Sequence, residues 1–180
     1  MERRVILLSL ILAASALAAK DVPPGFVFSG NGVQHTGDPS VRIRIGERLT
    51  PQALRKRFAR YQVQYASGED CTACAIVSGG DGRFEVYFAK DARTVRGIRT
   101  SDERSRDSQD NAARGSLLQI VGTTSLRCDA GDETTCASPD VRGLAYIIAE
   151  DEKCPLSVER RKPTTISACT RIEGFLAGTR

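Results

Sequence analysis

The chain of 180 residues has no tryptophan, one histidine and an aromatic share of only 6%. This shortage leaves little material for an aromatic platform that stacks on carbohydrate rings. A Ser–His–Asp or Cys–His mechanism would have to use the single histidine, His35. His35 stands among glycines and prolines, so we predict an exposed loop residue there and not a rigid, buried base.

The composition also lacks a strong excess of either charge. Lysine and arginine number 26 against 22 aspartate and glutamate residues, which gives a net charge of +4. Nucleic-acid-binding domains usually concentrate a basic excess on one face, so we expect no nucleic-acid partner. Apolar residues make up 41% of the chain and charged residues 27%, which is typical of a globular protein. We also expect no cofactor.

No apolar run in the sequence is long enough for a membrane-spanning helix. The candidate at residues 5–17 is too short to cross a bilayer. Arg3 and Arg4 precede it, and Ala16-Leu17-Ala18 has the small-x-small pattern of a signal-peptidase site, which predicts a cleaved signal peptide over residues 1–19. No cysteine follows the run directly, so we expect neither a membrane span nor a lipid anchor. The sequence thus predicts a periplasmic or secreted bacterial protein.

The residues after this leader are enough for one domain with its own core. Residues 20–40 are interrupted by Pro23-Pro24-Gly25 and Gly37-Asp38-Pro39, which predicts an extended N-terminal arm. Residues 41–180 are predicted to form a single domain. Arginine alternates with valine and isoleucine over residues 41–45, which predicts a half-buried first strand.

The first half of this domain combines one helix with several strands. Thr50 followed by Pro51 is a typical helix start, and apolar residues then repeat with helical spacing, which predicts a helix over residues 50–59. The glycine-rich residues 79–82 predict the turn of a hairpin. The predicted strands are residues 61–65, 74–78, 83–89 and 95–100.

The second half repeats this order of elements. Residues 115–121 predict a turn that leads into a short helix, and the predicted strands are residues 124–128, 144–149 and 166–176. The last strand should bend at Gly174. Together these patterns predict an α+β fold of mostly antiparallel sheet with two short helices, and the repeated order favours two helix-plus-meander units.

All six cysteines follow the predicted leader, in a compartment where disulfides persist. Six cysteines allow fifteen pairings, of which nearest-neighbour pairing is the simplest. We predict three disulfides and no metal site, because the spacings lack the two tight pairs that are typical of structural zinc. Nearest-neighbour pairing would join Cys71 with Cys74, Cys128 with Cys136, and Cys154 with Cys169, but the sequence does not choose among the fifteen pairings.

The motif Cys71-Thr72-Ala73-Cys74 also allows a redox hypothesis. Thiol–disulfide oxidoreductase chemistry would need Cys71 at a helix N-terminus, where the helix dipole lowers the pKa of the thiol. Here the motif precedes the apolar, strand-like residues 75–77, and a thioredoxin-like βαβ context is missing. We therefore favour a structural disulfide and keep the oxidoreductase as the alternative.

Two acidic patterns carry further hypotheses. Asp129, Asp132 and Glu133 could approach a calcium ion, but their spacing lacks the full ladder of ligands that calcium loops provide. A pair of carboxylates elsewhere in the chain could support hydrolase chemistry of the glycosidase kind. No particular catalytic residue is predicted.

Residues 101–114 are almost entirely polar and separate the two halves. Long polar loops often carry binding residues, and arginine pairs with carboxylates in a planar, bidentate geometry. We therefore predict that Arg104 and Arg106 contact a protein partner. The alternative is that the segment is only a connector.

A series of landmarks follows in a recognisable order over residues 49–176. They are a helix at residues 50–59 followed by Tyr61 and Val63, a strand that ends near Ile98, Gly115, Cys128 and Cys136 around a Gly-Asp loop, Tyr146 in an apolar strand, and Ile172 in the closing strand. This layout resembles the bacterial sigma-E-regulated periplasmic lipoprotein family, which has no established activity. The resemblance implies a shared fold and no site residues. Unlike that family, this chain lacks a lipobox cysteine and adds four cysteines.

Two functional classes fit these observations. The favoured one is an exported envelope protein with a non-catalytic binding role, such as an inhibitor or immunity protein against a cell-wall hydrolase, or an envelope stress factor. Its partner would be another envelope or secreted protein. The alternative is a periplasmic enzyme, either a thiol–disulfide oxidoreductase that uses Cys71 and Cys74 or a carboxylate-based hydrolase.

Overall fold

The computed structural model describes residues 24–68, 71–159 and 162–178, with the side chains of residues 68, 71 and 72 outside the description. The predicted signal peptide, residues 1–19, lies outside the described residues. Within those residues, no helix combines the length and the apolar character needed to cross a membrane.

The described chain contains two short helices and 14 strands. The helices are α1 (Pro51–Arg57) and α2 (Leu117–Val121). The strands are β1 (Phe26–Ser29), β2 (Gly32–His35), β3 (Arg42–Arg44), β4 (Gln62–Gly68), β5 (Cys71–Gly79), β6 (Gly82–Phe88), β7 (Val95–Thr100), β8 (Arg106–Asp107), β9 (Gly115–Ser116), β10 (Ser125–Ala130), β11 (Thr134–Ala137), β12 (Leu144–Ile148), β13 (Pro163–Thr165) and β14 (Arg171–Gly178).

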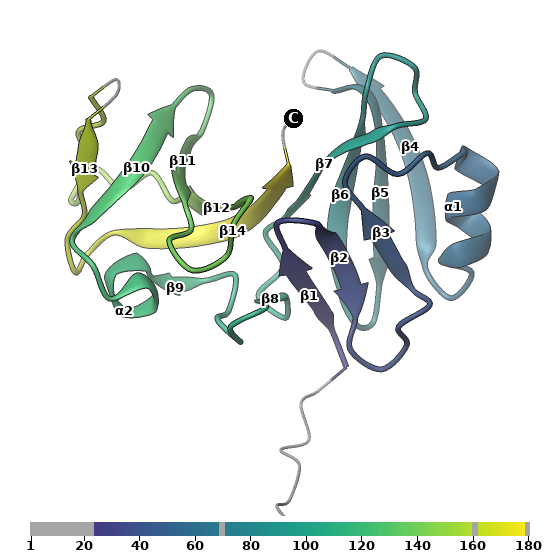
Figure 1. Ribbon diagram of the computed structural model, residues 1–180, viewed down its shortest axis with the longest axis horizontal. Coiled ribbons are helices and arrows are strands. Elements are labelled where there is room, and N and C mark those ends of the chain that lie inside the picture. Colours follow the sequence, from purple (N-terminus) through teal and green to yellow (C-terminus); the bar gives the residue numbers. More distant parts are fainter. Residues whose placement is uncertain (1–23, 69–70, 160–161, 179–180) are drawn as a thin grey trace, which may run out of the picture.

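The larger sheet contains two meanders that meet at their last strands. Its order is β13-β10-β11-β12-β14-β7-β6-β5-β4, and β9 pairs with β14 beside this path. Each meander follows a helix, so the repeated order of elements that the sequence suggested is present. Figure 1 shows β14 (yellow) running from one half of the molecule toward β7 in the other. The α+β fold of mostly antiparallel sheet with two short helices is confirmed.

A smaller sheet of order β3-β2-β1-β8 replaces the N-terminal arm that the sequence predicted. β1 and β2 form a hairpin in which Ser29 pairs with Gly32, so Gly30 and Asn31 are its two-residue loop. Neither loop residue has a positive φ, but Gly32 beside them has a φ of +140°, and a Cβ atom on Gly30 would lie 1.7 Å from the carbonyl oxygen of Arg142. The hairpin therefore needs glycine at both positions, for a close approach at Gly30 and for a positive φ at Gly32, and Phe26 and Phe28 of β1 are buried.

The core lies between the two sheets and is rich in aromatic rings. The Phe26 ring of β1 meets the Phe84 ring of β6 edge to face, with centroids 4.9 Å apart. The ring of Phe28 in the smaller sheet packs against the ring of Phe175 in β14, with centroids 6.0 Å apart. One continuous cluster of buried apolar residues extends through both halves and includes Leu117 of α2. Phenylalanine burial of this kind supplies a large part of the folding free energy.

Helix α1 begins as the sequence predicts and ends two residues earlier than expected. The Thr50 hydroxyl accepts a hydrogen bond from the Ala53 N–H at 3.2 Å, and Pro51 occupies the first turn. The buried side chains of Leu54 and Phe58 face the core. Arg55 and Lys56 are exposed on the other faces, as the amphipathic pattern requires, while Arg57 is half-buried.

The bend predicted in the last strand is also present. The pairing of β12 with β14 shifts register between Ile147 and Ile148, opposite Gly174. A Cβ atom on Gly174 would lie 2.1 Å from the carbonyl oxygen of Thr100, so β14 can approach β7 only without a side chain there.

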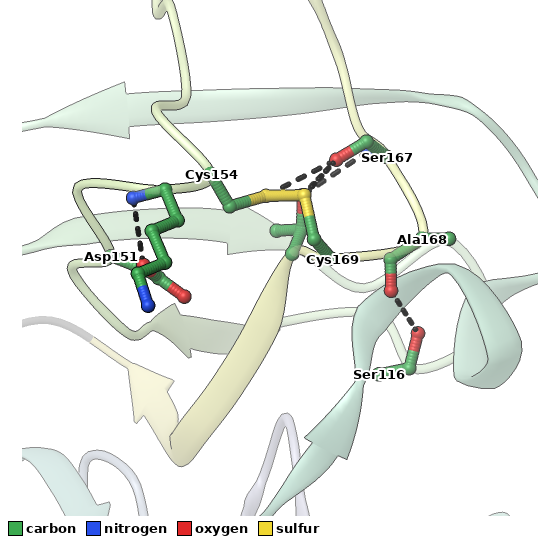
Figure 2. Close-up of a disulfide and its surroundings, with 8 residues drawn as sticks. Ser116, Asp151, Cys154, Ser167, Ala168 and Cys169 are labelled. Carbon is green, nitrogen blue, oxygen red and sulfur yellow. Dashed lines mark hydrogen bonds between the residues drawn. A yellow bond between two sulfur atoms is a disulfide. The ribbon is translucent and has the colours of Figure 1, made fainter.

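Two of the three predicted disulfides are confirmed, between Cys128 and Cys136 and between Cys154 and Cys169. The first joins directly paired residues of β10 and β11. The second fastens the loop after β12 to the turn before β14, where the Ser167 hydroxyl lies 2.9 Å from the Cys169 sulfur (Figure 2). Cys74 is disulfide-bonded as well, while the side chain of Cys71 lies outside the described residues.

Candidate functional site

The polar segment of residues 101–114 is fastened to the fold by a buried carboxylate. Asp107 is only 2% exposed, and its Oδ1 atom accepts hydrogen bonds of 2.9 Å from the N–H groups of Gln109 and Asn111. Its Oδ2 atom accepts from the Asn111 amide at 2.9 Å and from the Tyr146 hydroxyl at 3.3 Å. The segment is therefore an anchored turn and not the freely solvated loop that its composition suggested.

Arg104, a predicted partner contact, is held in a fixed position at the surface. Its Nε atom donates to Asp102 Oδ1 at 2.9 Å and its Nη2 atom donates to Oδ2 at 2.6 Å. The Nη1 atom donates to the carbonyl oxygen of Gly80 in the β5–β6 turn. The hydrogen bonds from Arg104 lower the pKa of Asp102, so the pair stays ionised at neutral pH. The side chain of Arg104 remains 49% exposed.

Arg106, the other predicted contact, lies in β8 beside the first strand. Val27 of β1 is its pairing partner, and Ala112 forms an isolated bridge with it. Its side chain is half-buried, and it takes part in no ion pair among the described residues. The structure thus holds both arginines on one anchored segment, two residues apart, with only Arg104 already paired to a carboxylate.

The start of the segment borders a small cavity of about 180 Å³. Arg83, Glu85 and Arg99 project from β6 and β7 into its wall, and Asp102 closes one side. Thr100 fixes the exit of β7, because its hydroxyl donates to the Arg83 carbonyl oxygen at 2.7 Å. A cavity lined by charged side chains and by Phe84 thus lies next to Arg104.

Arg99 also lines this cavity, and no pattern in the sequence singles it out as a site residue. It forms an ion pair with Glu133 of the β10–β11 turn, and its Nη1 atom lies 3.8 Å from Glu85 Oε2. Glu85 also accepts a 2.6 Å hydrogen bond from the Tyr87 hydroxyl. Only the pairing of β7 with β14 brings the two halves close enough for this contact, so local patterns could not have revealed it.

Glu133 belongs to the acidic group that was considered for calcium, but its carboxylate is bound to Arg99. The described residues contain no group of three or more histidine, cysteine, aspartate or glutamate side chains arranged to hold a metal ion.

His35 is buried and not the exposed loop residue that the sequence predicted. It is 8% exposed at the end of β2, and its ring meets Phe26 edge to face at 5.4 Å. Its Nδ1 atom accepts a hydrogen bond from the Gly37 N–H at 3.1 Å, and its Nε2 atom lies 3.4 Å from Asp81 Oδ2. The Tyr61 hydroxyl donates to the same carboxylate oxygen at 2.9 Å. Burial, with a further contribution from Asp81, raises the pKa of Tyr61 to about 12.

The second cysteine of the C-x-x-C motif lies within a strand. Cys74 is 8% exposed in β5 and pairs with Ala66 of β4. Catalytic thiols of oxidoreductases are exposed at helix N-termini, where the helix dipole stabilises the thiolate. Cys71, which this chemistry would need at a helix N-terminus, is instead the first residue of β5, and Cys74 is buried in the same strand. Both positions favour a structural role for the disulfide of Cys74.

Comparisons with known proteins include a distant structural neighbour. No family model matches the sequence, and no curated protein matches it. The chain is similar to the crystal structure of the uncharacterized protein yfeY from Escherichia coli, with a TM-score of 0.46 and 11% sequence identity. The superposition covers 76% of this chain and 93% of that chain. Membership of the sigma-E-regulated lipoprotein family stays a prediction.

Proposed function

We infer that this protein is an exported, non-catalytic binding protein of the bacterial envelope, whose partner contacts the surface around Arg104 and Arg106. The observation that carries the proposal is the anchored exposure of Arg104. An arginine that is already oriented loses little side-chain entropy when a partner binds, so more of the contact energy contributes to affinity.

The hydrogen bonds of Arg104 leave part of its guanidinium available. Three of its five N–H donors are used in the bonds to Asp102 and Gly80, which leaves two for a partner's carboxylate. Arg106 adds a second cation two residues away. This arrangement fits an acidic surface of another envelope or secreted protein. The roles we propose for this protein are those of an inhibitor or immunity protein that acts on a cell-wall hydrolase, or of an envelope stress factor.

The test begins with affinity capture from an envelope extract, using the full exported protein as bait, followed by titration calorimetry with the recovered partner at low salt. We expect Arg104→Ala with Arg106→Ala to weaken binding by about 2–5 kcal/mol if the contact is buried. The matched control is Arg127→Ala with Arg171→Ala, which removes two exposed arginines from β10 and β14. Unchanged affinity in the first variant, or failure to recover any partner, would contradict the proposal.

A further inference from the structure

The basic residues of this chain are concentrated in one short stretch. Residues 41–60 hold seven of the 26 basic side chains and only one of the 22 acidic ones, so they carry a net charge of +6 while the rest of the chain carries −2. The modest overall charge conceals this asymmetry. These residues come from β3, from α1, from the segment between them and, at Arg60, from just beyond α1. Three of the seven, Arg42, Arg44 and Arg57, line an open groove of about 800 Å³.

The base of the groove contains an ion pair that protects the outer edge of the smaller sheet. Arg57 of α1 lies 2.7 Å from Glu47 and donates a 2.9 Å hydrogen bond to the carbonyl oxygen of Arg42. Glu47 in turn accepts a 3.1 Å hydrogen bond from the N–H of Arg44. These bonds occupy backbone groups on the free edge of β3, so a partner strand cannot extend the sheet there. A ligand of this groove must be recognised by side chains.

The ion pair also determines which charges remain available. Arg57 neutralises Glu47, the acidic residue in the groove wall. Arg42 and Arg44 are exposed, and neither has an ion pair among the described residues. Asp38 is the acidic residue of the adjoining β2–β3 turn, where its carboxylate accepts hydrogen bonds from the Ser40 N–H and hydroxyl.

The spacing of the two free arginines indicates what they can bind. Residues two apart on a strand lie on the same face with their Cα atoms about 7 Å apart. The side chains of Arg42 and Arg44 therefore leave β3 on one face, and both residues line the groove. Each can pair with a phosphate through two parallel hydrogen bonds. The groove is open and not an enclosed cavity, which suits successive phosphate groups better than one small, buried anion.

We propose that the groove between β3 and α1 binds the phosphate groups of an extended anionic ligand through Arg42 and Arg44. The phosphates belong either to the headgroups of an anionic lipid surface or to a soluble phosphate chain. This site shares no residue with the Arg104 and Arg106 surface, so failure of one proposal does not affect the other.

The experiment uses the exported protein and two probes. Cosedimentation with vesicles of phosphatidylglycerol in phosphatidylcholine, against phosphatidylcholine alone, tests lipid headgroups. Calorimetry with tripolyphosphate tests the soluble source. We expect Arg42→Gln with Arg44→Gln to weaken binding of the effective probe about tenfold or more, because both bidentate contacts are lost. The control Arg127→Gln with Arg171→Gln removes the same charge from exposed positions in the other half, and we expect it to change binding by less than about twofold, since only long-range attraction is reduced.

If the variant with Arg42→Gln and Arg44→Gln loses binding of one probe and the control variant does not, the proposal is supported and that probe identifies the source of the phosphate. Equal loss in the two variants, or absence of binding to both probes, overturns it. The melting temperature of each variant should match that of the parent protein, because all four side chains are exposed and unpaired in the described structure. A variant that does not fold is replaced by the corresponding single substitution, Arg42→Gln or Arg44→Gln, judged by the same criterion.

Discussion

Tyr146 connects the two halves of the molecule through its hydroxyl group. The side chain is 1% exposed in β12, and its hydroxyl lies 3.2 Å from the Ser138 hydroxyl and donates to Asp107 Oδ2 at 3.3 Å. Burial raises the pKa of Tyr146 to about 12, and the nearby Asp107 carboxylate contributes in the same direction. The folded protein therefore favours the neutral phenol.

This pKa predicts a loss of stability in alkaline solution. The folded state keeps a proton that an unfolded tyrosine releases near its ordinary pKa of 10, so the free energy of unfolding falls as the pH rises from about 10 to 12. The loss should amount to about 2–3 kcal/mol for this residue. Urea unfolding across that range should show a shallower decline for Tyr146→Phe, while Tyr61 keeps part of the slope in both proteins. If the free energy of unfolding falls equally steeply with pH in the parent protein and in Tyr146→Phe, the raised pKa does not belong to Tyr146.

At the scale of elements, the contact between β14 and β7 depends on Gly174. A Cβ atom there would meet the Thr100 carbonyl oxygen at 2.1 Å, and the strands would have to separate. We expect Gly174→Ala to destabilise the protein by about 2–4 kcal/mol in urea unfolding.

Gly80 in the β5–β6 turn provides the matched control for this prediction. A Cβ atom on Gly80 would have no neighbour within 4 Å, and the φ angle of Gly80 is not positive. Gly80→Ala should therefore change stability by no more than about 0.5 kcal/mol, as is usual for surface substitutions. Comparable losses in the two variants would show that the close approach of the strands is unimportant.

At the scale of the whole molecule, the two meanders should unfold together. They share one buried cluster of apolar residues, and Asp107 and Arg99 add polar contacts to the second half. A single core of this kind gives one cooperative transition in small domains. Differential scanning calorimetry should show one peak whose calorimetric and van't Hoff enthalpies agree, with the disulfides left intact. Two resolved peaks would indicate that each helix-plus-meander unit folds independently.

Local patterns predicted much of the secondary structure. Four features were predicted correctly: the start of α1, the β5–β6 hairpin, the bend at Gly174 and two disulfides. Each depends on residues that are close in the sequence or, for the disulfides, on the pairing that only cysteine can form. The β1–β2 hairpin was missed because the proline- and glycine-containing segments on either side of it, residues 23–25 and 37–39, are equally typical of an irregular arm. Its burial against Phe84 distinguishes the two cases, and that contact is made across the core.

The candidate sites depend more strongly on tertiary structure. The sequence by itself determined the residue types, namely the arginines of residues 101–114 and the basic stretch of residues 41–60. Three contacts depend on the fold alone. Asp107 is buried and anchors the segment that carries Arg104, and Glu133 forms an ion pair with Arg99. The Arg57 side chain donates a hydrogen bond to the carbonyl oxygen of Arg42 at the edge of β3. These contacts join residues far apart in the chain. Their distances follow from strand order and core packing, which periodicity in a single segment does not encode.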